Sequence, residues 1–321
     1  MTAAPLRTTL ERNAALDETL AGLRCVPKTL PARLFYDARG AELFEKICEL
    51  PEYYLTRSEL SILECRASEI ASVIGPDAAL IEYGSGAGRK VRLLLDALCD
   101  PRAYVPVDIS NEQLESVAQS LSADYPRVEV IPVCADYTSR FELPSLPSRV
   151  KRRVAFFPGS TIGNFHPAHA AAFLSRIRSL IGPDGLLVLG VDRLKDAKVL
   201  NAAYNDSRGV TREFNLNMLR HVNALAGADF QIDKFAHHAF FNEAASRIEM
   251  HLRSLEDQVV SVGGEAIELG YGETIWTESS YKYSGELFDA LVSAAGFEVG
   301  HLWTDESANF WVAVLSPRCD S

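Results

Sequence analysis

The stretch IEYGSGAGRK, residues 81–90, places Gly84, Gly86 and Gly88 within five positions, directly after an apolar run. Backbone without a Cβ lets a ligand approach closely, and the start of a following helix offers free N–H donors. Asp108 ends the next apolar run, 24 residues after Gly84. A carboxylate in that place can accept hydrogen bonds from both hydroxyls of a ribose, although an acid there can also be a turn or cap residue. The pattern predicts a site for an adenosine-bearing cofactor.

The spacing of the glycines argues against NAD. The loop reads GxGxG and is followed by Arg89 and Lys90, whereas dinucleotide-binding loops read GxGxxG. The third glycine is therefore not where close packing of helix and strand beneath a pyrophosphate requires it. The spacing disfavours NAD but does not by itself choose between S-adenosylmethionine and a nucleotide.

A second polar stretch, FFPGSTIGNF, covers residues 156–165 and follows the fourth predicted strand. The side chain of Asn164 offers one carbonyl acceptor and two N–H donors. That set suits the amine and the carboxylate of an amino acid together. A turn or a helix cap before HPAHA is the alternative interpretation of Asn164.

Alternating strands and helices must position these groups. Apolar residues at three- and four-residue spacing predict helices, and short apolar runs bounded by glycine predict buried strands. The predicted strands cover residues 78–83, 103–108, 128–136, 152–159 and 185–192, and the predicted helices cover 59–74, 90–98, 111–125 (with Ser110 as N-cap) and 169–181. This alternation predicts a parallel, doubly wound sheet.

The end of the chain completes this sheet. A helix over residues 285–297 precedes two apolar runs, 298–305 and 309–316, which we expect to form an antiparallel hairpin at the sheet edge. A seven-stranded sheet with this ending resembles the layout of class I methyltransferases. In that class, an acid after the third strand meets the adenine amino group and the next side chain flanks the ring. Asp136 and Tyr137, in CADY, match those two positions. This resemblance makes S-adenosylmethionine the preferred cofactor, with a nucleotide or NAD as the alternative.

Two segments interrupt the regular pattern. The segment 1–60 lacks a strand–helix rhythm and is rich in aromatic side chains, and the segment 193–283 begins helically and continues with two predicted strands, 235–241 and 246–255. We expect an N-terminal arm over residues 1–60, a cofactor-binding domain over 61–192, an inserted lobe over 193–283 and a completion of the sheet over 284–321. The arm and the inserted lobe are predicted to form a second, substrate-binding lobe.

Composition excludes several other classes. The net charge of −11 disfavours a nucleic-acid partner, because binding to phosphates needs a basic face. No apolar run approaches the roughly 18 residues that a membrane span needs, and the polar start is no signal peptide. The six cysteines and seven histidines show no metal-ligand spacing. We expect a cytoplasmic protein with reduced thiols, without a metal, that does not bind membranes.

Five motifs together carry a more specific resemblance. LPEYYLTRSE, EYGSGAGRK, FFPGSTIGNF, SRIEMHL and TESSYKY closely resemble the histidine-specific N-alpha-methyltransferases of ergothioneine biosynthesis. The resemblance covers nearly the whole chain, including the N-terminal arm and the insertion. It implies trimethylation of the α-amino group of L-histidine to hercynine, with S-adenosylmethionine as methyl donor and S-adenosylhomocysteine as product. We further expect a monomer.

The resemblance also implies roles for individual residues. Tyr36, Asn164 and Tyr204 are the expected catalytic residues around the amine, and water or Tyr36 would take its proton. The side chains expected to bind substrate are Tyr53, Asn164, Tyr204, Met250, Glu278 and Ser280, of which Glu278 and Ser280 would recognise the imidazole. The expected cofactor-binding residues are Gly84, Ser85, Gly86, Lys90, Asp108, Asp136 and Tyr137. One departure lies within the glycine loop, where AGR replaces the more usual residues before Lys90.

Three alternatives stay open. A sister enzyme could methylate tryptophan or tyrosine, but an indole pocket would gain little from the carboxylate of Glu278. A binding or regulatory protein could keep the fold without catalysis, and the intact set of Tyr36, Tyr53, Asn164, Tyr204 and Glu278 argues against this. An NAD-dependent oxidoreductase would bind nicotinamide.

Overall fold

The computed structural model describes residues 4–86, 88–109, 111–139 and 141–318. The chain divides into two compact units. One, here called the α/β unit, comprises residues 55–194 and 281–321. The other, here called the discontinuous unit, comprises residues 1–54 and 195–280. Ser110, the expected helix cap, and Ala87 of the glycine loop lie outside the described residues.

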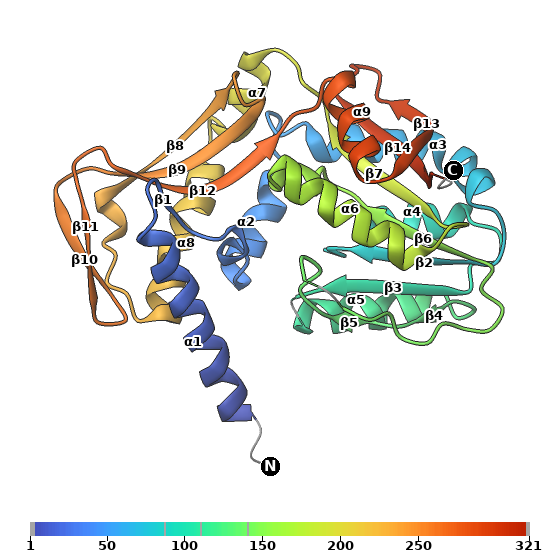
Figure 1. Cartoon of the computed structure of the whole chain (residues 1–321), viewed down its shortest axis with the longest axis horizontal. Helices are drawn as coiled ribbons and strands as arrows, with labels where there is room; N and C mark the ends of the chain where they lie inside the picture. Colours follow the sequence, from blue (N-terminus) through green and yellow to red (C-terminus); the bar gives the residue numbers. More distant parts are fainter. Residues whose placement is uncertain (1–3, 87, 110, 140, 319–321) are drawn as a thin grey trace. The chain divides into compact units, whose positions relative to one another are not determined.

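The α/β unit is built on one mostly parallel sheet (Figure 1). Its strand order is β13-β14-β7-β6-β2-β3-β4, and β5 also pairs with β3. The strands are β2 (Ala78–Tyr83), β3 (Ala103–Asp108), β4 (Glu129–Val130), β5 (Val133–Cys134), β6 (Arg152–Phe157), β7 (Leu186–Asp192), β13 (Phe297–Thr304) and β14 (Phe310–Pro317). Only β14 against β7 and β13 against β14 run antiparallel in this sheet as described. The doubly wound parallel sheet and its closing hairpin are confirmed.

One predicted strand is wrong. The run 128–136 forms two short strands, β4 and β5, so the described sheet has eight strands instead of seven. Pro132 lies between them. Because proline has no N–H to donate, it interrupts the ladder with β3.

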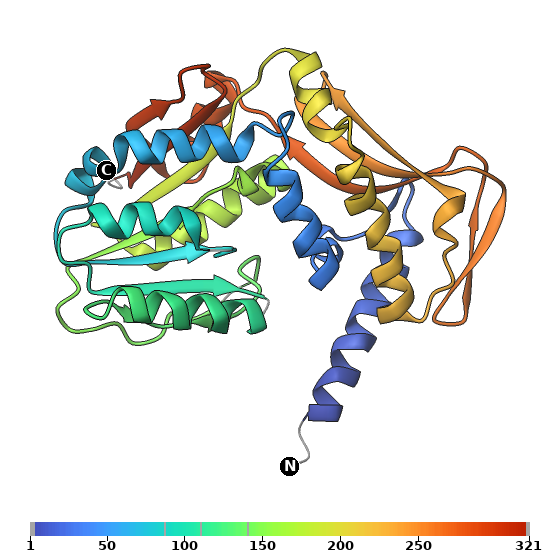
Figure 2. The same ribbon diagram turned by 180° about the vertical axis from the view of Figure 1, so that it is seen from behind.

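Helices cover both faces of this sheet (Figures 1 and 2). On one face lie α6 (Pro167–Ile181) and α9 (Gly285–Ala294), whose apolar sides join the strands in a continuous core. On the other lie α3 (Leu55–Ile74), α4 (Arg89–Ala97) and α5 (Asn111–Asp124). All six residues of β2 are buried, as expected for a strand covered on both faces.

The discontinuous unit contains a four-stranded sheet in the order β1-β12-β9-β8 and a two-stranded hairpin, β10-β11. Its strands are β1 (Lys28–Thr29), β8 (Phe235–Asn242), β9 (Arg247–Ser254), β10 (Gln258–Val262), β11 (Glu265–Leu269) and β12 (Thr274–Tyr281, whose last residue falls in the α/β unit). Its helices are α1 (Ala4–Leu23), α2 (Ala38–Cys48), α7 (Ala197–Tyr204) and α8 (Val210–Ala226), and short 3₁₀ turns precede α2 and β8. β1, from the N-terminal arm, pairs with β12, from the insertion.

The sequence pattern gave part of this unit. The helical start of the insertion and its strands 235–241 and 246–255 are confirmed as α7, α8, β8 and β9. No element was predicted within the N-terminal arm, where the structure has α1, β1, α2 and the start of α3. The strands β10, β11 and β12 were not predicted. Among the described helices, none combines the length and apolar character of a membrane span.

Candidate active site

The glycine loop has a backbone conformation that residues with a Cβ rarely adopt. Gly84 and Gly88 have φ of +73° and +69°, in the left-handed region that glycine enters without steric cost. A Cβ on Gly86 would meet nothing within 4 Å, so there is open space beside it. Gly88 caps the N-terminus of α4, where free N–H groups favour anionic ligands.

Ser85 adds a second sign of a ligand site. Its residue is 4% exposed, and its hydroxyl has no hydrogen-bond partner among the described residues. A buried polar group without a partner costs about 1–3 kcal/mol, which a hydrogen bond to a ligand would offset. An adenosine-bearing cofactor with polar atoms therefore fits the residues of this loop.

The two aspartates predicted to bind the cofactor lie at or just after the carboxyl ends of neighbouring strands. Asp108 ends β3 and pairs with Cys134 of β5, two residues before Asp136. Asp136 Oδ1 accepts hydrogen bonds from the Thr138 N–H and hydroxyl at 2.8 and 2.6 Å, so this aspartate also closes a local turn. Tyr137 lies beside the glycine loop, since a Cβ on Gly84 would stand 3.8 Å from its hydroxyl. Burial, with added repulsion from Asp108 and Asp136, raises the pKa of Tyr137, and its phenol stays neutral.

A buried acid lies just before the loop. Glu82 is 2% exposed and accepts a 2.5 Å hydrogen bond from the Tyr104 hydroxyl. Burial raises the pKa of Glu82 to about 8, although the Tyr104 hydroxyl and the positive charge of Lys90 oppose the shift. Glu82 therefore carries a proton over most of the neutral range.

Asn164 ends the 3₁₀ turn Thr161–Asn164, and its side chain is exposed. Three contacts within the α/β unit fix the loop that carries it. The Ser160 hydroxyl accepts the Asp192 N–H at 2.8 Å, and the Gly159 N–H donates to the carboxylate of Glu59. A Cβ on Gly163 would stand 2.8 Å from the Tyr281 carbonyl oxygen, so the loop lies directly on that backbone.

Two of the predicted substrate tyrosines meet in the discontinuous unit. The rings of Tyr53 and Tyr204 contact edge to face with centroids 6.2 Å apart, and both residues are less than a tenth exposed. The Tyr204 hydroxyl donates to Ser280 Oγ at 2.8 Å. An aromatic chain extends from Tyr53 through Phe44 to Tyr36, which is 49% exposed. The sequence had pointed to the three tyrosines and Ser280 but not to these contacts.

Glu278 lies close enough to this cluster to act on it electrostatically. Burial, followed by charges that include Tyr204 and Glu278, raises the pKa of Tyr53 well above its ordinary value. Glu278 and Ser280 are on β12, and Met250, which is 2% exposed, is on the adjacent β9. The structure thus gathers Tyr53, Tyr204, Met250, Glu278 and Ser280 in one unit. These side chains present a neutral phenol surface, a carboxylate and a hydroxyl.

Sequence reasoning missed the polar network beneath this cluster. Asn215 is fully buried on α8, where it donates to the His251 carbonyl at 3.0 Å and accepts from the Thr277 hydroxyl at 2.8 Å. His237 Nδ1 lies 2.9 Å from Asn215 Nδ2, and His237 Nε2 lies 2.9 Å from the Tyr204 carbonyl. Burial lowers the pKa of His237, so the ring is neutral, with its proton on Nε2 facing the carbonyl. The only sequence signal was a polar residue on the apolar face of a predicted helix.

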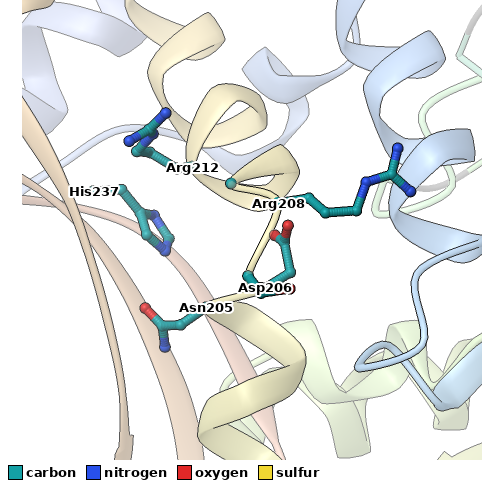
Figure 3. Close-up of a pocket in the computed structure, with 7 residues that line it drawn as sticks. Asn205, Asp206, Arg208, Arg212 and His237 are labelled. Carbon is teal, nitrogen blue, oxygen red and sulfur yellow. The ribbon is translucent and has the colours of Figure 1, made fainter.

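A surface hollow lies at the start of α8 in the same unit (Figure 3). Arg208 and Arg212 extend from it in different directions and do not converge on one point (Figure 3). Asp206 accepts the N–H groups of Val210 and Thr211 at 2.9 and 2.8 Å, so the helix N-terminus already has an anionic cap. The hollow holds no residue predicted to act on a substrate. Within the described part of the chain, no cluster of three His, Cys, Asp or Glu side chains could hold a metal ion.

The strand order with its antiparallel hairpin, and the glycine loop followed by an acid on the next strand, are the layout of a Rossmann-like class I methyltransferase. Comparison with known proteins gives the particular family. The model of the family described as histidine-specific, SAM-dependent methyltransferases matches residues 15–317, and the chain belongs to this family. It is therefore an enzyme.

The curated relatives carry consistent names. The histidine N-alpha-methyltransferase of Mycolicibacterium smegmatis is 42% identical over 92% of this chain and 92% of its own length. The protein of the same name from Mycobacterium tuberculosis is 41% identical over 93% of this chain and 94% of its own. Ergothioneine biosynthesis protein 1 of Neurospora crassa is 36% identical over 87% of this chain, which matches 32% of that longer protein.

Proposed function

We propose that the protein transfers three methyl groups in succession from S-adenosylmethionine to the α-amino nitrogen of L-histidine. The products would be hercynine and S-adenosylhomocysteine, and the reaction would open ergothioneine biosynthesis. The observation that carries the proposal is the family match over residues 15–317. The names of the relatives support the position of the methylated nitrogen and the pathway.

The cofactor half of the site is proposed for the α/β unit. S-adenosylmethionine supplies a methyl group on a positively charged sulfur when it is bound. Gly84, Ser85 and Gly86 would surround its amino-acid part, with the orphaned Ser85 hydroxyl as a hydrogen-bonding group. Lys90 would face its carboxylate, and Asp108 its ribose hydroxyls. Asp136 and Tyr137 would meet the adenine.

The substrate-binding roles proposed here are those that the family resemblance implies for individual residues. Asn164 and Tyr204 would hold the amine and the carboxylate, and Tyr53, Met250, Glu278 and Ser280 would surround the imidazole. The Tyr204 hydroxyl donates to Ser280, which fixes the direction of its O–H bond. The carboxylate of Glu278 would accept an imidazole N–H.

These residues would favour transfer in three ways. Holding the amine in line with the methyl group removes much of the entropic barrier. The nitrogen lone pair would form the new N–C bond as the C–S bond of S-adenosylmethionine breaks, and the proton on nitrogen would leave to water, directly or passed on by the Tyr36 hydroxyl. The tyrosine rings can stabilise the methylated cation through cation–π contacts, worth about 0.5–2 kcal/mol each.

The direct test is incubation with L-histidine and S-adenosylmethionine followed by mass spectrometry. We expect histidine to gain three methyl groups, each adding about 14 mass units, through mono- and dimethyl species. An unchanged histidine mass would overturn the proposal. Tryptophan and tyrosine in parallel incubations test the alternative that the chain methylates another aromatic amino acid.

The role of Glu278 is tested by Glu278→Ala. Glu278 is half-buried, and its loss would leave the imidazole N–H without its proposed acceptor. We expect kcat/KM for histidine to fall about a hundredfold or more and selectivity towards tryptophan to relax. Glu268→Ala on β11, where the side chain is exposed, is the matched control and should behave as the wild type. Unchanged histidine kinetics in Glu278→Ala would remove Glu278 from the site.

We also propose that the enzyme acts as a monomer in the cytoplasm and binds neither nucleic acid nor membranes. The net charge of −11 supports the absence of a nucleic-acid partner. Light scattering after size-exclusion chromatography tests the monomer, for which we expect one species near 35.3 kDa.

A further inference from the structure

Glu59 is a fully buried carboxylate that the proposed reaction does not yet use. It lies on α3 and is 0% exposed. Its Oε2 atom stands 2.6 Å from Lys90 Nζ, and the Gly159 N–H donates to Oε2 at 2.8 Å and to Oε1 at 3.0 Å. One carboxylate thus joins the lysine that follows the glycine loop to the loop that ends at Asn164.

The neighbouring strand leaves room for this carboxylate. A Cβ on Gly190 of β7 would stand 2.1 Å from Glu59 Oε1, a distance that no side chain tolerates. Glycine at this position therefore admits the carboxylate, and its φ is not in the left-handed region. Burying an ion pair costs desolvation energy that apolar side chains of similar volume do not incur. Packing alone does not account for a charged pair in this place.

We propose that Glu59 is a positioning residue that orients the Lys90 ammonium towards the carboxylate of S-adenosylmethionine and, through Gly159, fixes the Asn164 loop in register with it. Lys90 keeps 21% of its side chain exposed while Glu59 keeps none, so of the two partners the lysine is the one that a ligand can reach. This inference rests on the proposed cofactor role of Lys90.

The first variant is Glu59→Gln, which keeps an acceptor for the Gly159 N–H but loses the charge that holds Lys90. We expect the Kd for S-adenosylmethionine, measured by calorimetry without histidine, to rise about tenfold or more. The kcat at saturating cofactor should change much less, because the Gly159 contact survives. Glu64→Gln, an exposed glutamate on the same helix, is the matched control and should bind the cofactor as the wild type does.

A double-mutant cycle shows whether Glu59 acts through Lys90. Lys90→Met should itself weaken cofactor binding, and adding Glu59→Gln should then weaken it little further, because residues in direct contact are not additive. An equal additional loss in the Lys90→Met background would overturn the proposal, as would a wild-type Kd in Glu59→Gln.

Gly190→Ala provides a second route in case Glu59→Gln does not fold. The added methyl displaces the Glu59 carboxylate without removing its charge. Lys90 and the Gly159 N–H then both lose their contact with the carboxylate. We expect a raised Kd for the cofactor and a lowered kcat, and wild-type values for both in a folded Gly190→Ala protein would contradict the proposal. The binding measurement needs no turnover. If the wild type binds the cofactor but does not methylate histidine, the proposed function is refuted, and the Kd measurements still test the role of Glu59.

Discussion

Lys282 and Asp192 form an ion pair in which both side chains are 0% exposed and the charged atoms are 2.7 Å apart. Lys282 follows directly on the TESSY stretch, and the backbone N–H of Asp192 donates to Ser160 in the Asn164 loop. Replacing Lys282 with methionine keeps most of the side-chain volume but leaves a carboxylate in the core without its cation.

The magnitude follows from burial. At 2.7 Å and an effective dielectric of about 20, the Coulomb attraction is about 6 kcal/mol, and the desolvation of both ions opposes it. Removing one partner loses the attraction but leaves the desolvation cost of the other. We therefore expect Lys282→Met to lower the free energy of unfolding by about 3 to 5 kcal/mol. The double variant Lys282→Met with Asp192→Leu should recover a large part of this loss.

Urea unfolding followed by circular dichroism measures the effect on the cofactor-free protein. The matched control is Lys151→Met, because Lys151 pairs with Asp77 at 2.6 Å in the same unit but is 71% exposed. Exposed pairs contribute little, so the control should lose less than about 1 kcal/mol. The reasoning is refuted if Lys282→Met unfolds at the same urea concentration as Lys151→Met.

Two further predictions concern buried polar groups. Asn215→Leu removes hydrogen bonds to His237, the His251 carbonyl and Thr277 and should lower the free energy of unfolding by about 3 kcal/mol; a loss below about 1 kcal/mol in urea unfolding would show that the network is dispensable. Because burial raises the pKa of Glu82 to about 8 from its ordinary value of 4.5, the folded state binds its proton more tightly than the unfolded state. The stabilisation from that proton is fully present below pH 4.5 and is lost as the pH rises through about 8. Glu82→Gln should flatten this fall in unfolding free energy between pH 5 and 9, and an unchanged pH profile would contradict the shifted pKa.

The α/β unit could be predicted largely from local pattern. Continuous apolar runs such as residues 78–83 and 103–108 are buried on both faces of the sheet, and Gly84 ends the first of them with a positive φ. Both signals lie within a few residues of the sequence, so the strands can be predicted without knowledge of the tertiary structure. Pro132 was a local sign that the third strand is interrupted, but the apolar residues around it favoured one continuous strand.

The discontinuous unit was harder to read because its order depends on partners far along the chain. β1 has two residues and exists only through its pairing with β12, about 250 positions later. The aromatic side chains of the N-terminal arm gave no period, yet Tyr53 finds Tyr204 in the insertion. A pattern search along the chain does not see such pairings.

The sequence by itself determined the parallel sheet, the cofactor loop and, through its motifs, the residue types that recognise a substrate. Only the tertiary structure decided which polar groups are buried and what each of them faces. Glu59, Lys282 and Asn215 read as ordinary polar residues in a helix or after a strand, because composition and spacing do not reveal solvent exposure. Burial makes their charges and hydrogen bonds strong and the loss of a partner costly, and burial is a property of the folded chain.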